Sequence, residues 1–265
     1  MMKRKCLCAL VCLLFGYFAQ ANEKPELNIS VGEWPPYLSS DLKHNGVIAH
    51  LISDLFADEG YRVNFHFLPW ARAYLSASAG HVDGTAVWMH KADREAVFLF
   101  SAPLLHEQLV FFHLKSQPFD WQRFDELTGM TLGGHLGHSY GASFDAFLAE
   151  GKVKMERVAG DRQNFEKLLK ERVVLYPQEK SVGYAALRAH FSLEDQAKIT
   201  HHPKPINIKY SYLLLPKSLP NSPALIALFN KRLQLYRESG RYQRYFDDLQ
   251  QGKYQQEPSA SSASE

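Results

Sequence analysis

The chain has 265 residues, in which 30 Lys and Arg residues oppose 28 Asp and Glu residues to give a formal net charge of +2. This length allows one large domain or two lobes of roughly 100 residues each. Because the charge is nearly balanced and no sustained basic patch is present, nucleic acid and anionic membrane surfaces are not expected as partners.

The first 21 residues have the pattern of a secretory signal peptide. The basic residues 3–5 precede an apolar run over residues 6–18, which is too short for a membrane span. Ala19-Gln20-Ala21 then supplies the small residues that signal peptidase requires. We therefore predict cleavage after Ala21, secretion through the inner membrane and a location in the periplasm.

All three cysteines lie within this segment. Cys6, Cys8 and Cys12 would be removed with the signal peptide, so the mature chain would hold no disulfide, thiol nucleophile or thiolate metal ligand. A lipid on Cys12 fits the sequence less well than plain secretion, because Val11 precedes it where a small residue is expected.

Short apolar stretches alternate with helical patterns in the first half of the mature chain. We predict strands over residues 27–31, 61–68, 84–89 and 109–114, and helices over residues 47–56 and 70–79. This alternation implies a twisted, largely parallel sheet with helices on its faces.

The same alternation restarts in the second half. We predict strands over residues 131–137, 153–158, 173–176 and 206–215, helices over residues 143–150, 162–172 and 181–190, and two final helical stretches divided by Gly240. Residues 251–265 are expected to form a disordered tail, and the Ser, Ala, Gln and Glu composition is clearest from Gln255. The chain thus reads as one α/β unit, a second unit and a return segment.

Several short motifs follow the predicted strands in a distinctive order. They are Gly32-Glu33-Trp34-Pro35-Pro36-Tyr37, Pro69-Trp70-Ala71-Arg72-Ala73, Gly80-His81-Val82-Asp83-Gly84, Asp93-Arg94-Glu95, Phe100-Ser101-Ala102-Pro103, Leu127-Thr128-Gly129 and Gly137-His138-Ser139-Tyr140-Gly141. In this order, behind a signal peptide, they resemble the bacterial extracellular solute-binding proteins of family 3, the amino-acid-binding type of periplasmic receptor. The resemblance covers residues 27–249.

This resemblance implies an α/β fold of the two-lobed, type II periplasmic binding protein class, with each lobe a mostly parallel sheet flanked by helices. Lobe 1 would comprise residues 22–112 and 210–250, lobe 2 would comprise residues 113–209, and two hinge strands would join them. A small ligand would bind between the lobes. Because ligands collect beyond the carboxyl ends of strands in open α/β sheets, the residues that follow each strand are the candidates.

Arg94 is the first candidate for ligand binding. It lies six residues before Phe100 and so matches the family arginine that binds a ligand carboxylate. A planar guanidinium suits a carboxylate because it donates two parallel hydrogen bonds. The alternative is a surface arginine paired with Asp93 or Glu95.

The loop after the first strand offers aromatic candidates. Trp34 and Tyr37 flank two prolines, and this rigid loop would form an aromatic wall against the ligand. Core packing is the alternative for both residues and the favoured interpretation for Trp70. Arg72 would face either the cleft or a surface ion pair.

The second lobe contributes two candidates through the resemblance. Ser139 matches the position whose hydroxyl and backbone N–H meet the ligand carboxylate beside a helix N-terminus, although a helix-capping serine would look the same. Glu179 stands where the family usually has an aspartate for the ligand ammonium group. A charge at a helix start is the alternative for Glu179.

The stretch before Arg94 departs from the family pattern. Amino-acid binders usually carry Ser and Thr residues there, whereas this chain has Trp88 and His90. The pocket is therefore predicted to be larger and more aromatic, which puts an ordinary polar amino acid in doubt as the ligand.

No metal or cofactor is expected. The chain has 12 histidines, and two pairs of them lie close in sequence, at residues 135 and 138 and at residues 201 and 202. Neither pair has a third ligand at zinc-like spacing.

We predict a binding protein rather than an enzyme: a monomer that captures a small polar, carboxylate-bearing ligand and presents it to a membrane ABC permease. A sensory ligand-binding module that feeds a signalling partner is the alternative. A dehydratase-like enzyme on the same fold is a weaker one, for which Glu33, His90, His138 and Glu179 would supply acid and base groups. No nucleophile motif, metal set or phosphate-binding loop supports catalysis.

Overall fold

The computed structural model describes residues 24–256. The predicted signal peptide with its cleavage site lies outside the described residues, as do residues 257–265. Within residues 24–256, no helix is both long enough and apolar enough to cross a membrane.

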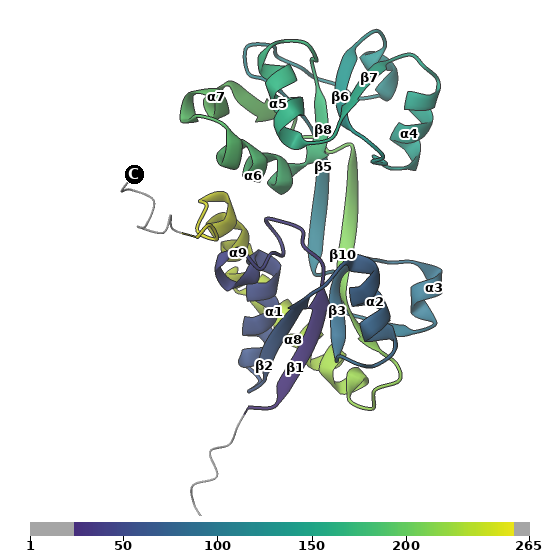
Figure 1. Cartoon of the computed structure of the whole chain (residues 1–265), viewed down its shortest axis with the longest axis vertical. Helices are drawn as coiled ribbons and strands as arrows, with labels where there is room; N and C mark the ends of the chain where they lie inside the picture. Colours follow the sequence, from purple (N-terminus) through teal and green to yellow (C-terminus); the bar gives the residue numbers. More distant parts are fainter. Residues whose placement is uncertain (1–23, 257–265) are drawn as a thin grey trace, which may run out of the picture.

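Two α/β lobes lie end to end and are joined by two long strands (Figure 1). These strands are β5 (Leu105–Leu114) and β10 (Asn207–Pro216), which pair antiparallel with Leu105 opposite Ser211. The predicted two-lobed α/β architecture is therefore confirmed.

The lower lobe in Figure 1 is built on strands in the order β2-β1-β3-β10-β5, with β4 beside β10. Its elements are β1 (Glu26–Val31), α1 (Val47–Ala57), β2 (Arg62–Phe67), α2 (Trp70–Ser78), β3 (Gly84–Met89), α3 (Ala92–Glu95), β4 (Phe98–Phe100), α8 (Ser222–Glu238) and α9 (Arg241–Gln250). Helix α1 forms because its apolar residues recur every three or four positions, and all of these residues are buried.

The upper lobe is built around the far half of β5, with β8 and β9 paired to it and a parallel pair β6-β7 beside them. Its elements are β6 (Thr131–His135), α4 (Ala142–Ala149), β7 (Lys154–Val158), α5 (Asp161–Leu169), β8 (Tyr176–Glu179), α6 (Lys180–His190), α7 (Leu193–Lys198) and β9 (Ile199–His201). Successive residues of β5 bury opposite faces, so Phe111 packs on Phe144 and Phe112 packs on Phe165. Helices cover both faces, which explains the unbroken apolar run in this strand.

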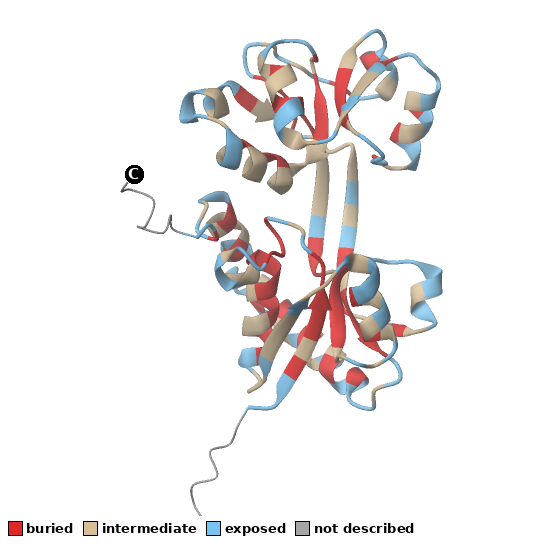
Figure 2. Ribbon diagram, viewed as in Figure 1, coloured by how far each residue is buried: buried red, intermediate tan, exposed pale blue. Residues whose placement is uncertain are grey.

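The passage between the lobes is short. Leu105 belongs to the core of the first lobe and Val110 to a core of the second, so β5 crosses over residues 106–109. Figure 2 shows only exposed and intermediate residues in this stretch and in the facing part of β10. We propose that the lobes divide here, a few residues before the boundary expected after residue 112.

Most predicted elements agree with the structure to within a few residues. The strand predicted over residues 173–176 is displaced, because β8 spans Tyr176–Glu179 and Leu175 only bridges Leu132 of β6. The first four residues of β5 and the short elements α3, β4, α7 and β9 were not predicted.

The folded part of the chain also extends further toward the C-terminus than expected. Residues 251–256 form a turn after α9, and the side chain of Tyr254 is only 4% exposed. Its hydroxyl hydrogen-bonds His50 of α1 at 2.9 Å. The prediction of a disordered tail from residue 251 is therefore wrong for this turn, because the aromatic ring of Tyr254 anchors it in the first core.

Candidate functional site

A cavity of about 310 Å³ lies beyond the carboxyl ends of β1 and β3, against the hinge strands. It is lined by Trp34, Trp70, Val87, Trp88, Met89, Arg94, Glu107, Lys209 and Ser211. Three of the predicted ligand-binding residues, Trp34, Trp88 and Arg94, are therefore brought together. The location agrees with the rule that ligands bind beyond the carboxyl ends of strands in α/β sheets.

Two tryptophans form one wall of this cavity. The rings of Trp70 and Trp88 meet edge to face at 5.3 Å, and the indole N–H of Trp88 donates to Thr85 at 2.7 Å. Trp70 also lies directly over Gly32, where a Cβ atom would come within 2.3 Å of its ring. Trp70, which was expected only to pack, therefore packs and lines the cavity.

The backbone beneath this wall is strained. Val87 has a φ of 64°, a conformation that is an outlier for a β-branched residue. It is the extra residue of an irregular pairing, because Ala86 pairs with Leu213 and Trp88 with Tyr212. Such bulges commonly redirect a neighbouring side chain, and strain of this kind costs on the order of 1–3 kcal/mol.

Arg94 lies in the short helix α3 at the edge of the cavity. Its guanidinium carbon is 4.8 Å from the centroid of the Trp88 ring, and Nη1 donates to the carbonyl of Met89. The surface ion pair considered for Arg94 does not form, since the carboxylate of Glu95 pairs with His90 at 2.6 Å. The stacked guanidinium keeps further N–H donors for a ligand.

Two charged residues of the cavity were missed in the sequence. Glu107 of β5 and Lys209 of β10 are paired across the hinge strands, and Ser211 donates a hydrogen bond to Glu107. Burial raises the pKa of Glu107. The sequence contained a signal for Glu107, because it is the only carboxylate in the stretch 104–114. It was passed over because the strand was predicted to begin only at residue 109.

Tyr37 and Glu179 lie together behind the cavity. Tyr37 is 1% exposed, and its hydroxyl lies near the side chains of Glu179 and Ser181 at the start of α6 in the second lobe. Tyr37 therefore joins the lobes and does not line the cavity. Glu179 accepts the backbone N–H of Val182 at 2.9 Å and so caps α6.

The environment of Glu179 favours its neutral form. Burial raises its pKa to about 7, and the nearby carboxylate of Glu107 acts in the same direction. The two side chains are close because Glu179 pairs with Leu109, two residues along β5 from Glu107. Glu107 in the cavity wall and Glu179 behind it thus place two carboxylates near the hinge strands.

Ser139 lies apart from Arg94, on the other lobe. It lines a different cavity, together with Gly137, His138, Asp145, Leu148, Ala149, Val153, Met155 and Arg157. Its hydroxyl donates to Asp145 and accepts the backbone N–H of Gly141 at 3.3 Å. In this arrangement of the lobes, Ser139 stabilises the loop before α4 and does not lie near Arg94.

The last two predicted residues do not line the cavity around Arg94. His90 is bonded to Glu95 and packs against Phe100 at 5.0 Å, and Arg72 is exposed on α2. Their predicted contact with a ligand stays a prediction.

Comparison with known proteins identifies the family. The model of the bacterial extracellular solute-binding proteins, family 3, matches residues 28–249. The chain belongs to this family. No curated protein sequence matches it at a significant level.

Solved structures of binding proteins share the fold of this solute-binding protein. The L-cystine solute receptor of Neisseria gonorrhoeae, unliganded and open, has a TM-score of 0.70 and 15% identity over 86% of this chain and 94% of its own. Substrate-binding domain 2 of GlnP from Lactococcus lactis, also open, has a TM-score of 0.68 and 21% identity over 86% and 96%. A histidine kinase sensor domain has a TM-score of 0.56 and 15% identity over 85% and 96%.

Within residues 24–256 of this solute-binding protein, no three His, Cys, Asp or Glu side chains are grouped to hold a metal ion. The stacked rings of His135 and His138 lie 4.5 Å apart, and His135 hydrogen-bonds Asp161 at 3.0 Å. The two histidines that are close in the sequence therefore contact each other in the fold.

The close approach at Gly32 allows a test of the tryptophan wall. We expect Gly32→Ala to displace the Trp70 ring and to destabilise the solute-binding protein by about 1–3 kcal/mol, the usual cost of overpacking. Tryptophan fluorescence and urea unfolding measure the two effects. Gly160→Ala is the matched control, because nothing lies within 4 Å of its added Cβ; equal stability of the two variants would contradict the packing of Trp70 on Gly32.

Proposed function

We propose that this solute-binding protein is exported to the periplasm, captures a small carboxylate-bearing ligand between its lobes and presents it, as a monomer, to a membrane ABC transporter. The ligand is an amino acid or a related compound. The observation that carries the proposal is the cavity in which Arg94 stacks on Trp88 beside the hinge strands.

The charges around this cavity suit a ligand with both signs of charge. Arg94 and Lys209 provide positive groups, and Glu107 provides a negative one, with Glu179 close behind it. A zwitterion can place its carboxylate on a guanidinium and its ammonium group near a carboxylate. The aromatic wall adds apolar contact area, which favours a ligand with an apolar or aromatic portion.

Ligand binding would favour the closed arrangement of the lobes. A ligand shifts a conformational equilibrium only by binding one state better than the other, and only closed lobes contact it on both sides. Ser139 would then reach the ligand by movement of its whole lobe about β5 and β10.

The comparisons support this class of ligand and leave a second candidate for the partner. The Neisseria structure is named as an L-cystine receptor. The similarity to a histidine kinase sensor domain favours signalling as the second candidate function. Measuring uptake of the identified ligand by cells that lack this chain distinguishes the two functions. Uptake should be lost if the chain is a transport receptor and should persist if it is a sensor module.

A ligand screen tests the proposal. The purified protein is heated with amino acids, amines, peptides and aromatic acids, and a ligand present at about 100 times its Kd should stabilise it by about 2.7 kcal/mol. The stabilising compound should be recovered chemically unchanged. No stabilisation by any class with a carboxylate, or turnover of the compound beyond stoichiometric amount, would contradict a binding role.

A further inference from the structure

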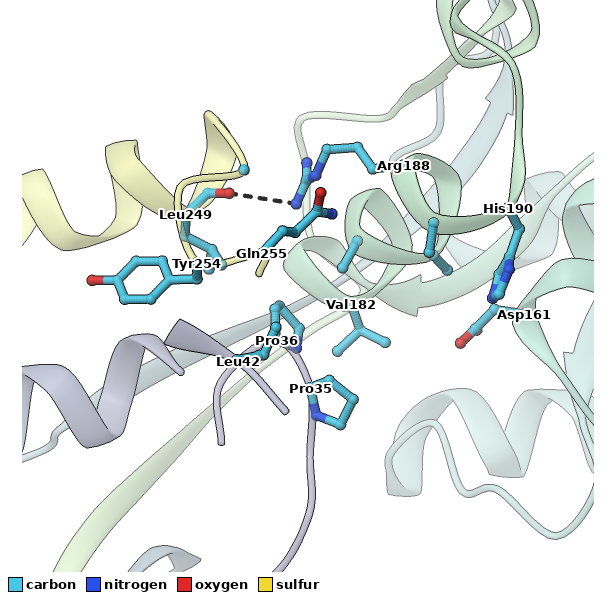
Figure 3. Close-up of a pocket in the computed structure, with 14 residues that line it drawn as sticks. Pro35, Pro36, Leu42, Asp161, Val182, Arg188, His190, Leu249, Tyr254 and Gln255 are labelled. Carbon is cyan, nitrogen blue, oxygen red and sulfur yellow. Dashed lines mark hydrogen bonds between the residues drawn. The ribbon is translucent and has the colours of Figure 1, made fainter. Parts of the chain in front are cut away.

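Residues of both lobes line a second cavity (Figure 3). Its volume is about 260 Å³. The first lobe contributes Pro35, Pro36, Leu42, Leu249 and Tyr254, and the second contributes Val182, Ala185, Ala186 and Ala189 from one face of α6. Figure 1 places α6 and α9 on one side of the β5 and β10 strands, and α2, α3 and α4 on the other. This cavity is therefore separate from the cleft at Arg94.

Arg188 gives this apolar cavity an underpaired positive charge. Its Nη2 donates only a long hydrogen bond, 3.4 Å to the carbonyl of Leu249, and its Nε is buried without a partner among the described residues. Burial lowers its pKa, which reflects the loss of water around the guanidinium. A charge that has lost part of its hydration and has no charged partner is unfavourable, so an anion that reaches the guanidinium would be bound.

The other charged groups of the cavity do not supply such an anion. Asp161 lies near His190 and away from Arg188 (Figure 3), and its Oδ1 accepts hydrogen bonds from His135, Tyr176 and Gln178. His190 also lines the cavity and adds no negative charge. Within residues 24–256, no carboxylate is therefore paired with Arg188, and the surface next to it is mostly apolar.

We propose that this cavity is a second small-molecule site, which takes a compact apolar molecule bearing a carboxylate. The carboxylate would bind the terminal Nη donors of Arg188, since Nε is already covered by protein atoms. The apolar part would pack between the alanines of α6 and the Pro35–Pro36 loop. Two adjacent donors of one guanidinium match the two oxygens of a carboxylate.

The position of this second site gives it an effect on the first. Its walls come from both lobes, on the side of the hinge away from Arg94, so rotation of the lobes that narrows one cleft widens the other. An occupant of the second site therefore holds the lobes open and weakens ligand capture, and the coupling is reciprocal. This effect, unlike the site itself, rests on the proposed function.

Calorimetry with benzoate tests the site, with uncharged benzamide as the matched compound. On the purified chain, Arg188→Met should weaken benzoate binding about tenfold or more, as expected when a charge-assisted hydrogen bond is lost. Arg172→Met, which alters an exposed arginine of the same lobe, should leave binding within about twofold, a change well below one hydrogen bond. Ala186→Trp should fill the cavity and abolish binding, with circular dichroism as the folding control for each variant.

The Arg94→Ala variant distinguishes benzoate binding at the second site from benzoate binding in the ligand cleft. Benzoate binding that survives Arg94→Ala and is lost with Arg188→Met establishes the second site, whatever the cleft binds. Loss with Arg94→Ala alone would place benzoate in the cleft and overturn the proposal. Binding that is equal for benzoate and benzamide, or absent, would also overturn it. If benzoate binds at Arg188 but leaves the affinity for the cleft ligand unchanged, the site stands and its coupling to closure fails.

Discussion

Replacing Arg94 with alanine should weaken ligand binding by about 2–5 kcal/mol, the cost of removing one partner of a charge pair that becomes desolvated when the lobes close. The guanidinium lies over the Trp88 ring at the cavity edge, with one N–H held by the Met89 carbonyl. It is therefore oriented before the ligand arrives, which reduces the entropy lost on binding. Calorimetry on the ligand identified by the thermal screen measures the loss.

Arg94→Lys tests whether geometry or charge matters. Lysine keeps the positive charge but removes the planar set of donors, so its affinity should fall between that of the parent and that of Arg94→Ala. Both variants should fold, because Arg94 is only partly buried and the short helix α3 contributes no buried residue. If Arg94→Ala binds within about twofold of the parent, a difference near 0.4 kcal/mol and below one good hydrogen bond, Arg94 is a surface residue. Lys209 and Arg72 would then be the next anchors to test.

Local patterns carried much of the fold prediction. Helix α1 was predictable because its apolar residues follow the helical period over three turns, and the first strand was predictable because it ends at a glycine. The strand predicted over residues 173–176 was misplaced because most of these apolar residues are buried without belonging to a paired strand. A buried loop can have the same apolar composition as a strand. Tyr254 was missed because a single buried aromatic in a polar segment has no period.

The site was less predictable, since it depends on pairing between distant segments. Trp34, Trp88 and Arg94 could be found because each follows a strand and matches a motif. Glu107 stands out as a lone carboxylate in the sequence, but its pairing with Lys209 could not be predicted, because that pairing requires the register of β5 against β10. That register is set by packing in both lobes and leaves no local pattern.

The cross-lobe contact of Tyr37 shows the same limit. The Pro-Pro loop predicted a rigid aromatic group near the ligand, and Trp34 takes that place. Tyr37 is instead buried near Glu179 and Ser181 of the other lobe, which are distant from it in the sequence and meet it only in the assembled fold.

Glu179 should make the stability of this solute-binding protein fall as pH rises from about 4.5 to about 7. Its pKa is raised from 4.5 to about 7 by burial, so between these values the folded chain binds a proton that the unfolded chain has lost. Stability falls with pH wherever the folded state binds more protons, and the shift sets an upper bound of about 3 kcal/mol on this change. Above pH 7 both states are ionised at this group, and its contribution becomes constant.

Glu179→Gln isolates this effect. Glutamine keeps an acceptor for the Val182 N–H but does not titrate, so the variant should gain stability relative to the parent between pH 5 and pH 8. Urea unfolding at several pH values measures the difference, and Glu238→Gln, at an exposed position, is the control. Parallel pH profiles for the parent and Glu179→Gln would show that Glu179 is ionised throughout this range.

The same proton couples pH to ligand capture. A ligand ammonium group stabilises the charged carboxylate, so a ligand that reaches Glu179 should release its proton and bind more tightly as pH rises from about 5 to 7, by up to about tenfold for each pH unit. Glu179→Gln should flatten this dependence, whereas Arg94→Ala should weaken binding at every pH and leave the slope in place. A slope that survives Glu179→Gln would assign the proton to another group. Glu107 is the next to test, because it lies in the same cavity and burial raises its pKa in the same direction.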